Sequence, residues 1–146
     1  MSGIFGINGI RGVANQDITP EFATAFGSAV GTWIGEGGTV ITGRDTRTTA
    51  RMMKRAFTTG LMSTGVDIVD FRVSPVPVIQ YLTSKFGADC SSSITASHNP
   101  PNYIGLKIFN SDGLEISEKE QKEISDIYMK KKFKRVDWRD VGEIVY

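Results

Sequence analysis

Apolar residues recur along the chain at two spacings, one typical of helices and one typical of strands. Between residues 22 and 34, large and small apolar residues return every three or four positions, which predicts a helix with one buried face. Thr19, followed by a proline, is a typical start for this helix. A second helix is predicted over residues 49–63, and three of its residues are expected to face inward: Met53, Phe57 and Leu61.

Short apolar runs before, between and after these helices predict strands over residues 4–7, 39–42, 66–73 and 90–95. Further helices are expected over residues 78–86 and from Ser117, which opens a capping box, to about Lys132. Asn110-Ser111-Asp112 predicts the turn of a β-hairpin over residues 105–116. Because strands and helices alternate, we expect an α/β fold, namely a three-layer α/β/α domain with a mixed, mostly parallel sheet over residues 1–146.

The carboxyl-terminal part of the chain suggests two further expectations. The run of lysines at 130–132 stands where a helix ends, so it is interpreted as a solvated helix end and not as a ligand patch. The last residues, 135–146, contain Trp138, Val141 and Ile144, so this segment is expected to pack against the domain.

Composition narrows the class of protein. A length of 146 residues suits one domain or one module of a larger protein, and the formal charge of +1 gives no reason to expect nucleic acid or a membrane as partner. The single cysteine, Cys90, excludes an internal disulfide and falls in a predicted strand, where a core role is expected. The sequence has neither a membrane-length apolar stretch nor a signal-peptide pattern, so we expect a cytoplasmic protein.

Residues 95–101, Thr-Ala-Ser-His-Asn-Pro-Pro, contain the only histidine and directly follow a predicted strand. Open α/β sheets hold their chemistry beyond the carboxyl ends of strands, so Ser97 is the first candidate for reactivity. Ser97 could be an acyl-transfer nucleophile with His98 as base, or a phosphoryl carrier. The side chains of adjacent residues tend to diverge, so Ser97 and His98 are poorly placed to act as nucleophile and base of a serine hydrolase. The Gly-x-Ser-x-Gly elbow of such hydrolases is also absent. A polar turn without chemistry is the remaining alternative.

Other segments offer the groups that a phosphate needs. Gly9-Ile10-Arg11-Gly12 places an arginine between glycines, Gly43-Arg44-Asp45-Thr46-Arg47 follows a predicted strand, and Lys107 lies ten residues after Ser97. Cationic side chains and exposed backbone amides stabilise phosphate oxygens. Alternatively, the two arginines of the second segment merely pair with Asp45 and cap a helix.

Together these segments resemble the α-D-phosphohexomutase family of phosphoglucomutases, phosphomannomutases and phosphoglucosamine mutases. Residues 5–12, Phe-Gly-Ile-Asn-Gly-Ile-Arg-Gly, look like its amino-terminal signature, and residues 43–47 look like its second conserved block. Residues 95–101 followed by Gly105-Leu106-Lys107 look like its phosphoserine loop. The order and spacing of the three blocks agree with the family over nearly the whole chain.

The resemblance implies that Ser97 is phosphorylated, donates its phosphoryl group to a hexose phosphate and takes one back from a hexose 1,6-bisphosphate. Mg²⁺ would bridge the phosphoserine, with Ser97 supplying one ligand through its phosphate. The residues implied to stabilise the phosphoryl group or move the proton are Arg11, His98 and Lys107. Those implied to bind substrate or phosphate are Arg44, Asp45, Arg47 and Asn99, with Asp45 orienting Arg11 or the loop.

The chain also departs from the family pattern. Ile104 stands where the family usually has asparagine, and Ile7-Asn8 replaces the common threonine followed by serine or aspartate. The resemblance covers only the first of four domains, so the other metal ligands are expected from a missing second domain and the fragment alone is expected to be inactive. A standalone module that binds a phosphosugar or a protein without catalysis is the alternative.

Overall fold

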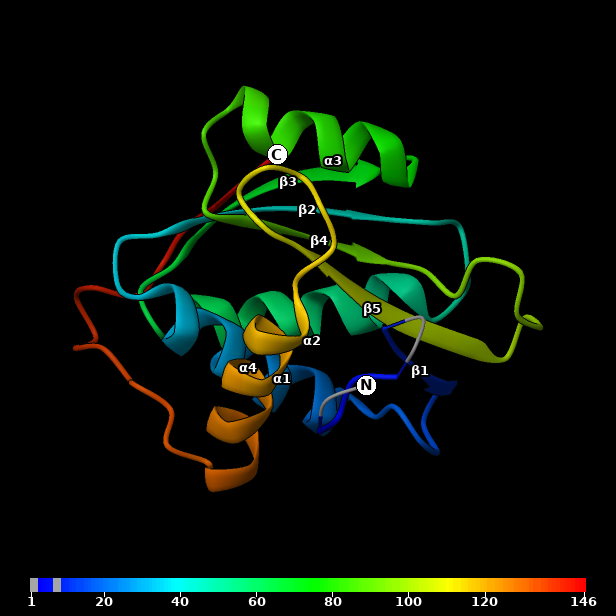
Figure 1. The fold of residues 1–146 in the computed structure, drawn as a ribbon, viewed down its shortest axis with the longest axis horizontal. Coiled ribbons are helices and arrows are strands. Elements are labelled where there is room, and N and C mark those ends of the chain that lie inside the picture. The colour runs from blue at the N-terminus through cyan, green and yellow to red at the C-terminus, as the bar shows by residue number, and fades with distance from the viewer. Residues whose placement is uncertain (1–2, 7–8) are drawn as a thin grey trace.

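The protein is described here by a computed structural model of residues 3–6 and 9–146, whose regular elements are six strands and four helices (Figure 1). In chain order they are β1 (Ile10–Val13), α1 (Pro20–Ile34), β2 (Thr39–Arg44), α2 (Ala50–Met62), β3 (Asp67–Val73), α3 (Val76–Lys85), β4 (Cys90–Ile94), β5 (Tyr103–Phe109), α4 (Glu118–Lys130) and β6 (Ile144–Val145).

All six strands form one sheet in the order β1-β5-β4-β2-β3-β6. The neighbours β4–β2, β2–β3 and β3–β6 are parallel, while β5 is antiparallel to both β1 and β4. The sheet is therefore mixed and mostly parallel, as predicted. Since β1 and β4 are both antiparallel to β5, the carboxyl ends of β1, β2, β3 and β4 lie at one edge of the sheet.

Helices cover both faces of the sheet, which confirms the three-layer architecture. Figure 1 shows α3 on one side and α1, α2 and α4 on the other. The main core lies under the three helices and includes the fully buried Phe26, Met53 and Phe57. A smaller core of Ile41, Ile79 and Ala88 lies under α3. Burial of these side chains is the principal source of stability for such a domain.

Local signals set the helix ends largely as predicted. The Thr19 side chain accepts a hydrogen bond from the Phe22 N–H at the start of α1, and Ser117 and Glu120 form the expected capping box before α4. Helix α3 begins at Val76, two residues earlier than predicted. N–H groups in the first turn of a helix have no carbonyl partner within the helix, so Pro77, which has no N–H, is tolerated there.

The first strand is not where the sequence pattern predicted it. Residues 4–6 form no strand beyond an isolated bridge between Gly6 and Gly9, and Ile7 and Asn8 lie outside the described residues. The apolar residue at position 5 belongs to the core and not to the sheet. The ring of Phe5 packs edge-on against Phe26, with centroids 5.7 Å apart. The first strand is β1, which pairs with β5 in the register Ile10↔Leu106.

The predicted hairpin is also wrong in its second half. Asn110 does form the turn, since its side chain accepts hydrogen bonds from the N–H groups of Asp112 and Leu114. The segment after it contacts β5 only through the single bridge Phe109↔Glu115. Strand β5 already has β1 on one side and β4 on the other, so no free edge is left for a second hairpin strand.

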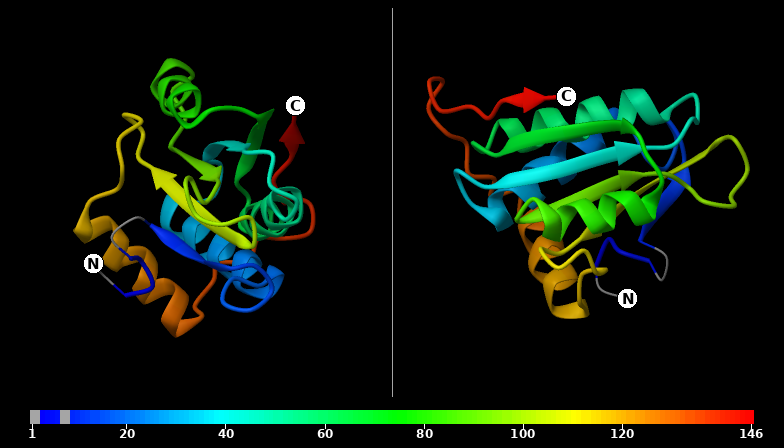
Figure 2. Two further views of the ribbon diagram at one scale, coloured as in Figure 1. Left: turned by 90° about the vertical axis from the view of Figure 1, so that its right-hand side faces the viewer. Right: turned by 90° about the horizontal axis from the view of Figure 1, so that it is seen from above.

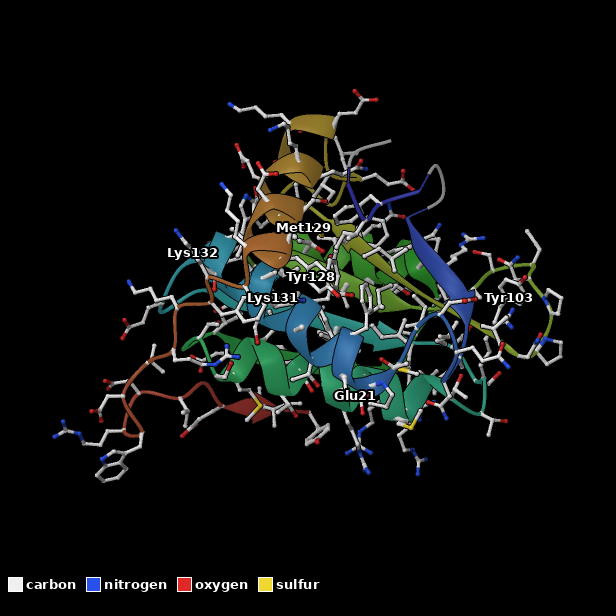
Figure 3. All side chains as sticks on the ribbon, turned by 90° about the horizontal axis from the view of Figure 1, so that it is seen from below. Glu21, Tyr103, Tyr128, Met129, Lys131 and Lys132 are labelled. Atoms are coloured by element: carbon white, nitrogen blue, oxygen red, sulfur yellow. The ribbon has the colours of Figure 1, made fainter. Side chains whose placement is uncertain are left out.

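The tail follows the expectation only in part. Ile144 and Val145 add β6 to the edge of β3, but Trp138 is 80% exposed and Val141 is 50% exposed, so the prediction that they pack was wrong. Figure 3 shows Lys131 and Lys132 at the end of α4, on the opposite side of the molecule from Tyr103. The Lys131 ammonium lies 3.6 Å from the centroid of the Tyr128 ring.

Two further expectations concern Cys90 and the membrane. Cys90 is fully buried in the main core, as predicted, and burial raises the pKa of its thiol, with the charges of Asp89 and Glu120 adding to the effect. Within the described residues, the helices are all too short or too polar to cross a lipid bilayer.

Candidate functional site

The loop from Thr95 to Asn102 joins β4 to β5 and projects beyond the sheet edge toward which β2, β3 and β4 point (Figure 2, right). Ser97 is exposed on this loop and has a φ of 53°. A side chain other than glycine costs about 1–2 kcal/mol in this left-handed region, so neighbouring contacts must hold Ser97 there. The Ser97 N–H donates to the Thr95 hydroxyl at 3.1 Å, and the Asn99 N–H donates to the Ala96 carbonyl at 3.0 Å.

Arg47 holds this loop from outside. Its Nη2 donates to the carbonyl oxygens of Ser97 at 3.0 Å and Asn99 at 2.7 Å. Its Nη1 donates to the carbonyl oxygens of Pro100 at 2.6 Å and Tyr103 at 3.4 Å. The structure thus brings Arg47 to the serine loop, but the guanidinium is directed at the backbone. Its geometry is that of a loop clamp.

Asp45 orients both Arg47 and the loop. Its Oδ1 accepts from the Arg47 N–H at 2.9 Å, and its Oδ2 accepts from the Arg47 Nε at 3.2 Å and from the Thr95 hydroxyl at 2.6 Å. The Asp45 N–H donates to the carbonyl of Ile94, the last residue of β4. The sequence left open whether Asp45 orients Arg11 or the loop. Asp45 is hydrogen-bonded to the loop through Thr95, and within the described residues no hydrogen bond or ion pair joins it to Arg11.

Arg11 reaches the serine side chain. It extends from β1, where it pairs with Gly105 of β5, and its Nη1 donates to the Asn99 Oδ1 at 2.9 Å while its Nη2 lies 3.4 Å from the Ser97 Oγ. Its Nε is buried and finds no hydrogen-bond partner in the described part of the chain. A planar guanidinium beside an exposed hydroxyl oxygen suits recognition of a phosphoryl group on that oxygen.

Gly105 and Thr95 shape the candidate site, and sequence reasoning assigned neither of them a role. A Cβ on Gly105 would lie 2.7 Å from the carbonyl oxygens of Ile10 and Thr95 and 2.9 Å from the Cγ of Arg11. Only glycine at position 105 leaves room for the Arg11 side chain, which extends from β1 next to β5. The available signal was an isolated glycine inside a strand pattern, which is typical of a close backbone approach.

Lys107 and His98 are not joined to the Ser97 side chain by a hydrogen bond in the described part of the chain. Lys107 lies on β5, where it pairs with Ser93 of β4. It follows Gly105 by two residues, so its side chain is on the same face of the sheet as Gly105 and about 7 Å farther along β5. It lines a pocket of about 30 Å³ that Gly9 and Glu115 also line. His98 is exposed beside Ser97. Within the described residues, neither side chain forms a hydrogen bond or ion pair.

Arg44 is separated from the serine loop. Its Nη1 donates to the Asp45 carbonyl at 3.0 Å, and its side chain lines a different pocket, which α2 and Asp70 of β3 also line. The structure therefore brings Arg11, Asp45, Arg47 and Asn99 to Ser97, and directs Arg44 elsewhere. The described residues contain no group of three or more His, Cys, Asp or Glu residues that could hold a metal ion.

Comparison with known proteins identifies the family to which the chain belongs. Residues 2–135 match the family model described as phosphoglucomutase/phosphomannomutase, alpha/beta/alpha domain I. The chain is 40% identical over 148 residues to a phosphoglucomutase/phosphomannomutase of Thermococcus kodakarensis, covering 99% of this chain and 32% of that protein. It is 36% identical over 138 residues to a phosphoglucosamine/phosphogalactosamine mutase of Sulfurisphaera tokodaii, covering 94% of this chain and 30% of that protein.

Among solved structures, a phosphoglucomutase/phosphomannomutase family protein from Burkholderia thailandensis superposes with a TM-score of 0.81 at 27% identity, covering 99% of this chain and 33% of that one. The chain thus spans about a third of the length of the relatives it matches. The sequence match, the fold and the order of the motifs agree, and the chain belongs to the phosphoglucomutase/phosphomannomutase family as its alpha/beta/alpha domain I.

Proposed function

We propose that Ser97 carries the phosphoryl group of a phosphohexomutase that interconverts hexose 1-phosphates and hexose 6-phosphates. The observation that carries this proposal is the approach of the Arg11 guanidinium to the Oγ of an exposed serine, held in a left-handed turn by Thr95 and Arg47. A serine in a fixed turn, beside a guanidinium that forms no ion pair within the described residues, is suited to carrying a dianion.

In the first half-reaction, a free hydroxyl of the hexose phosphate attacks the phosphorus on Ser97. The new O–P bond gives hexose 1,6-bisphosphate as the bond between phosphorus and the Ser97 Oγ breaks. The attacking hydroxyl loses its proton to a base, and the released Ser97 Oγ takes up a proton. The sugar then turns over, and Ser97 accepts the other phosphoryl group by the reverse steps. Positioning and charge dominate such a transfer, and Arg11, Lys107 and His98 are the groups here that supply charge or move the proton.

Mg²⁺ belongs to the same proposal. A phosphate on Ser97 offers the hard oxygen ligands that Mg²⁺ prefers, and the bound ion would neutralise part of the phosphoryl charge. The described residues contain no cluster of three or more His, Cys, Asp or Glu side chains that could complete such a site. We therefore expect the other ligands to come from a part of the enzyme outside this chain.

Because the relatives are about three times as long as this chain, we also propose that further domains complete the enzyme. They would supply the metal carboxylates and the contacts that choose between glucose, mannose and glucosamine phosphates. On this view the isolated chain holds part of an active site and turns over no substrate. The lone reduced cysteine fits a cytoplasmic enzyme.

The experiment that tests this proposal is mutase turnover of the intact protein with Ser97→Ala, assayed on glucose 1-phosphate and mannose 1-phosphate with the matching bisphosphate as primer. The matched control is Ser111→Ala, at an exposed serine in the Asn110 turn. We expect Ser97→Ala to lower kcat by a factor on the order of 10³ or more, and Ser111→Ala to leave it unchanged. Normal turnover by Ser97→Ala would overturn the proposal and favour a binding module without catalysis.

A further inference from the structure

A second concentration of positive charge lies away from the serine loop, between α2 and the β3–β6 edge of the sheet. Arg44, Arg51, Arg55 and Arg72 line a pocket with a volume of about 230 Å³, and this set of residues is called the arginine pocket below. None of these residues contacts Ser97, so the pocket is separate from the site proposed above.

The charge in the arginine pocket is not neutralised from within. The carboxylate lining it is Asp70, which is buried, and Asp70 is already paired with the buried Lys54 and accepts the Arg72 N–H at 2.7 Å. Over the part of the chain that the structure describes, none of the four arginines forms an ion pair with a carboxylate. Among the described residues, four guanidinium groups therefore line one hollow without an ion pair to a carboxylate.

Two of the arginines have contacts that restrict their side chains. The Arg44 guanidinium donates to the Asp45 carbonyl at 3.0 Å, and the Arg72 guanidinium lies 4.6 Å from the centroid of the Tyr146 ring. Arg72 also has a φ of 57°, in the region that disfavours side chains other than glycine. Contacts that hold two cations in position reduce the entropy lost when a ligand binds.

The other two arginines repel each other. Arg51 and Arg55 stand four residues apart on α2, so their side chains emerge on the same helix face. Like charges at this spacing destabilise a helix. An anion bound between them would offset that repulsion by attracting both guanidinium groups.

From this arrangement we infer that the arginine pocket binds a phosphate-bearing anion independently of Ser97. The guanidinium fork matches the spacing of phosphate oxygens and forms paired charge-assisted hydrogen bonds with them. A volume of about 230 Å³ is smaller than that of a typical pocket for a drug-sized molecule, so it suits a phosphate group with a short carbon skeleton at most. Ile144 and Tyr146 also line the pocket and offer apolar surface to such a skeleton.

The test is a titration of the ¹⁵N-labelled chain, followed by NMR at constant ionic strength, with inorganic phosphate in one arm and glycerol 3-phosphate in the other. We expect saturable shifts at the amides of residues 51–55 and 70–72 in both arms. Equal affinities in the two arms would show that the phosphate group alone is recognised, whereas tighter binding of glycerol 3-phosphate would show that the carbon skeleton contributes. Shifts that do not saturate, or that chloride reproduces, would overturn the inference.

Variants assign the binding to the pocket. The double variant Arg51→Gln/Arg55→Gln changes exposed side chains only, and we expect it to raise the Kd for phosphate by at least tenfold. The control Arg139→Gln alters an exposed arginine that pairs with Asp137 on the tail, and should leave the Kd unchanged. Arg11→Gln should leave these same shifts intact, since it lies at the serine loop. Saturable binding with the same Kd in the double variant would contradict the inference.

Discussion

The Thr95 hydroxyl donates a hydrogen bond of 2.6 Å to the Oδ2 of Asp45 and accepts one of 3.1 Å from the Ser97 N–H. One buried oxygen thereby links the carboxyl end of β2 to that of β4, and it sets the backbone position of the serine. The backbone of Ser97 is thus held at the sheet edge by Thr95 and Arg47, while its Oγ faces Arg11.

Removing that oxygen should loosen the loop and destabilise the domain. Thr95→Val keeps the shape but leaves the Asp45 carboxylate and the Ser97 N–H each short of a partner, so we expect the free energy of unfolding to fall by about 1–3 kcal/mol. Chemical denaturation of the chain measures this loss. Thr95→Ser, which keeps the hydroxyl, should lose less. A valine variant as stable as the wild type would show that the bridge contributes nothing.

The Arg47 clamp predicts a local effect on the loop. Arg47→Lys keeps the positive charge, but a single ammonium group cannot donate to all four carbonyl oxygens that the guanidinium reaches. We expect amide hydrogen exchange at residues 97–103 to become roughly tenfold faster, since a loss of about 1.4 kcal/mol of local stability has that effect. Core amides of α1 provide the internal reference and should change less. Uniform acceleration across the chain would argue for a global role instead.

Gly105 predicts a steric effect. In Gly105→Ala the new methyl group would lie 2.7 Å from two backbone carbonyl oxygens, which cannot move as a flexible side chain can. We expect a loss of stability greater than about 3 kcal/mol, measured by thermal or chemical unfolding. Gly87→Ala is the control: its φ is 63° but nothing lies within 4 Å of the added carbon, so only about 1–2 kcal/mol of backbone strain is expected. Equal losses in the two variants would contradict the steric account.

Cys90 predicts a pH dependence of stability. Burial raises the pKa of its thiol, so above about pH 8.5 the unfolded chain releases a proton that the folded chain retains. The unfolded state is then favoured, and stability falls as pH rises, with a slope approaching 1.4 kcal/mol per pH unit. Denaturation of the wild type and of Cys90→Ala between pH 7.5 and about 10 isolates this slope, because other titrations are common to both. Parallel curves would contradict it.

The approach of the motifs to one another could be predicted because it depends on strand direction. Ser97 follows β4 and Asp45 follows β2, and parallel strands bring their carboxyl ends to one edge of the sheet. The different directions of Arg44 and Arg47 could not be predicted. These residues stand three positions apart, and only the packed structure offers one of them the carbonyl oxygens of the loop and the other the arginine pocket.

The misplaced first strand and the incomplete hairpin have a shared cause. Strand β1 pairs with β5 across more than ninety positions of the sequence, as in Ile10↔Leu106. Local sequence patterns cannot predict a pairing between residues so far apart. That pairing occupies the edge of β5 which the hairpin strand would have used. The role of Gly105 depends on the same contact, because the carbonyl of Ile10 is what excludes a side chain there.

The most direct test of the central claim is phosphopeptide mapping of the intact protein after incubation with hexose 1,6-bisphosphate, using mass spectrometry. The account predicts one phosphoryl group on the peptide that contains Ser97, and its absence in Ser97→Ala, with the Ser111→Ala protein labelled as the wild type is. A phosphoryl group on a different residue, or mutase turnover in a protein that acquires none, would contradict the account.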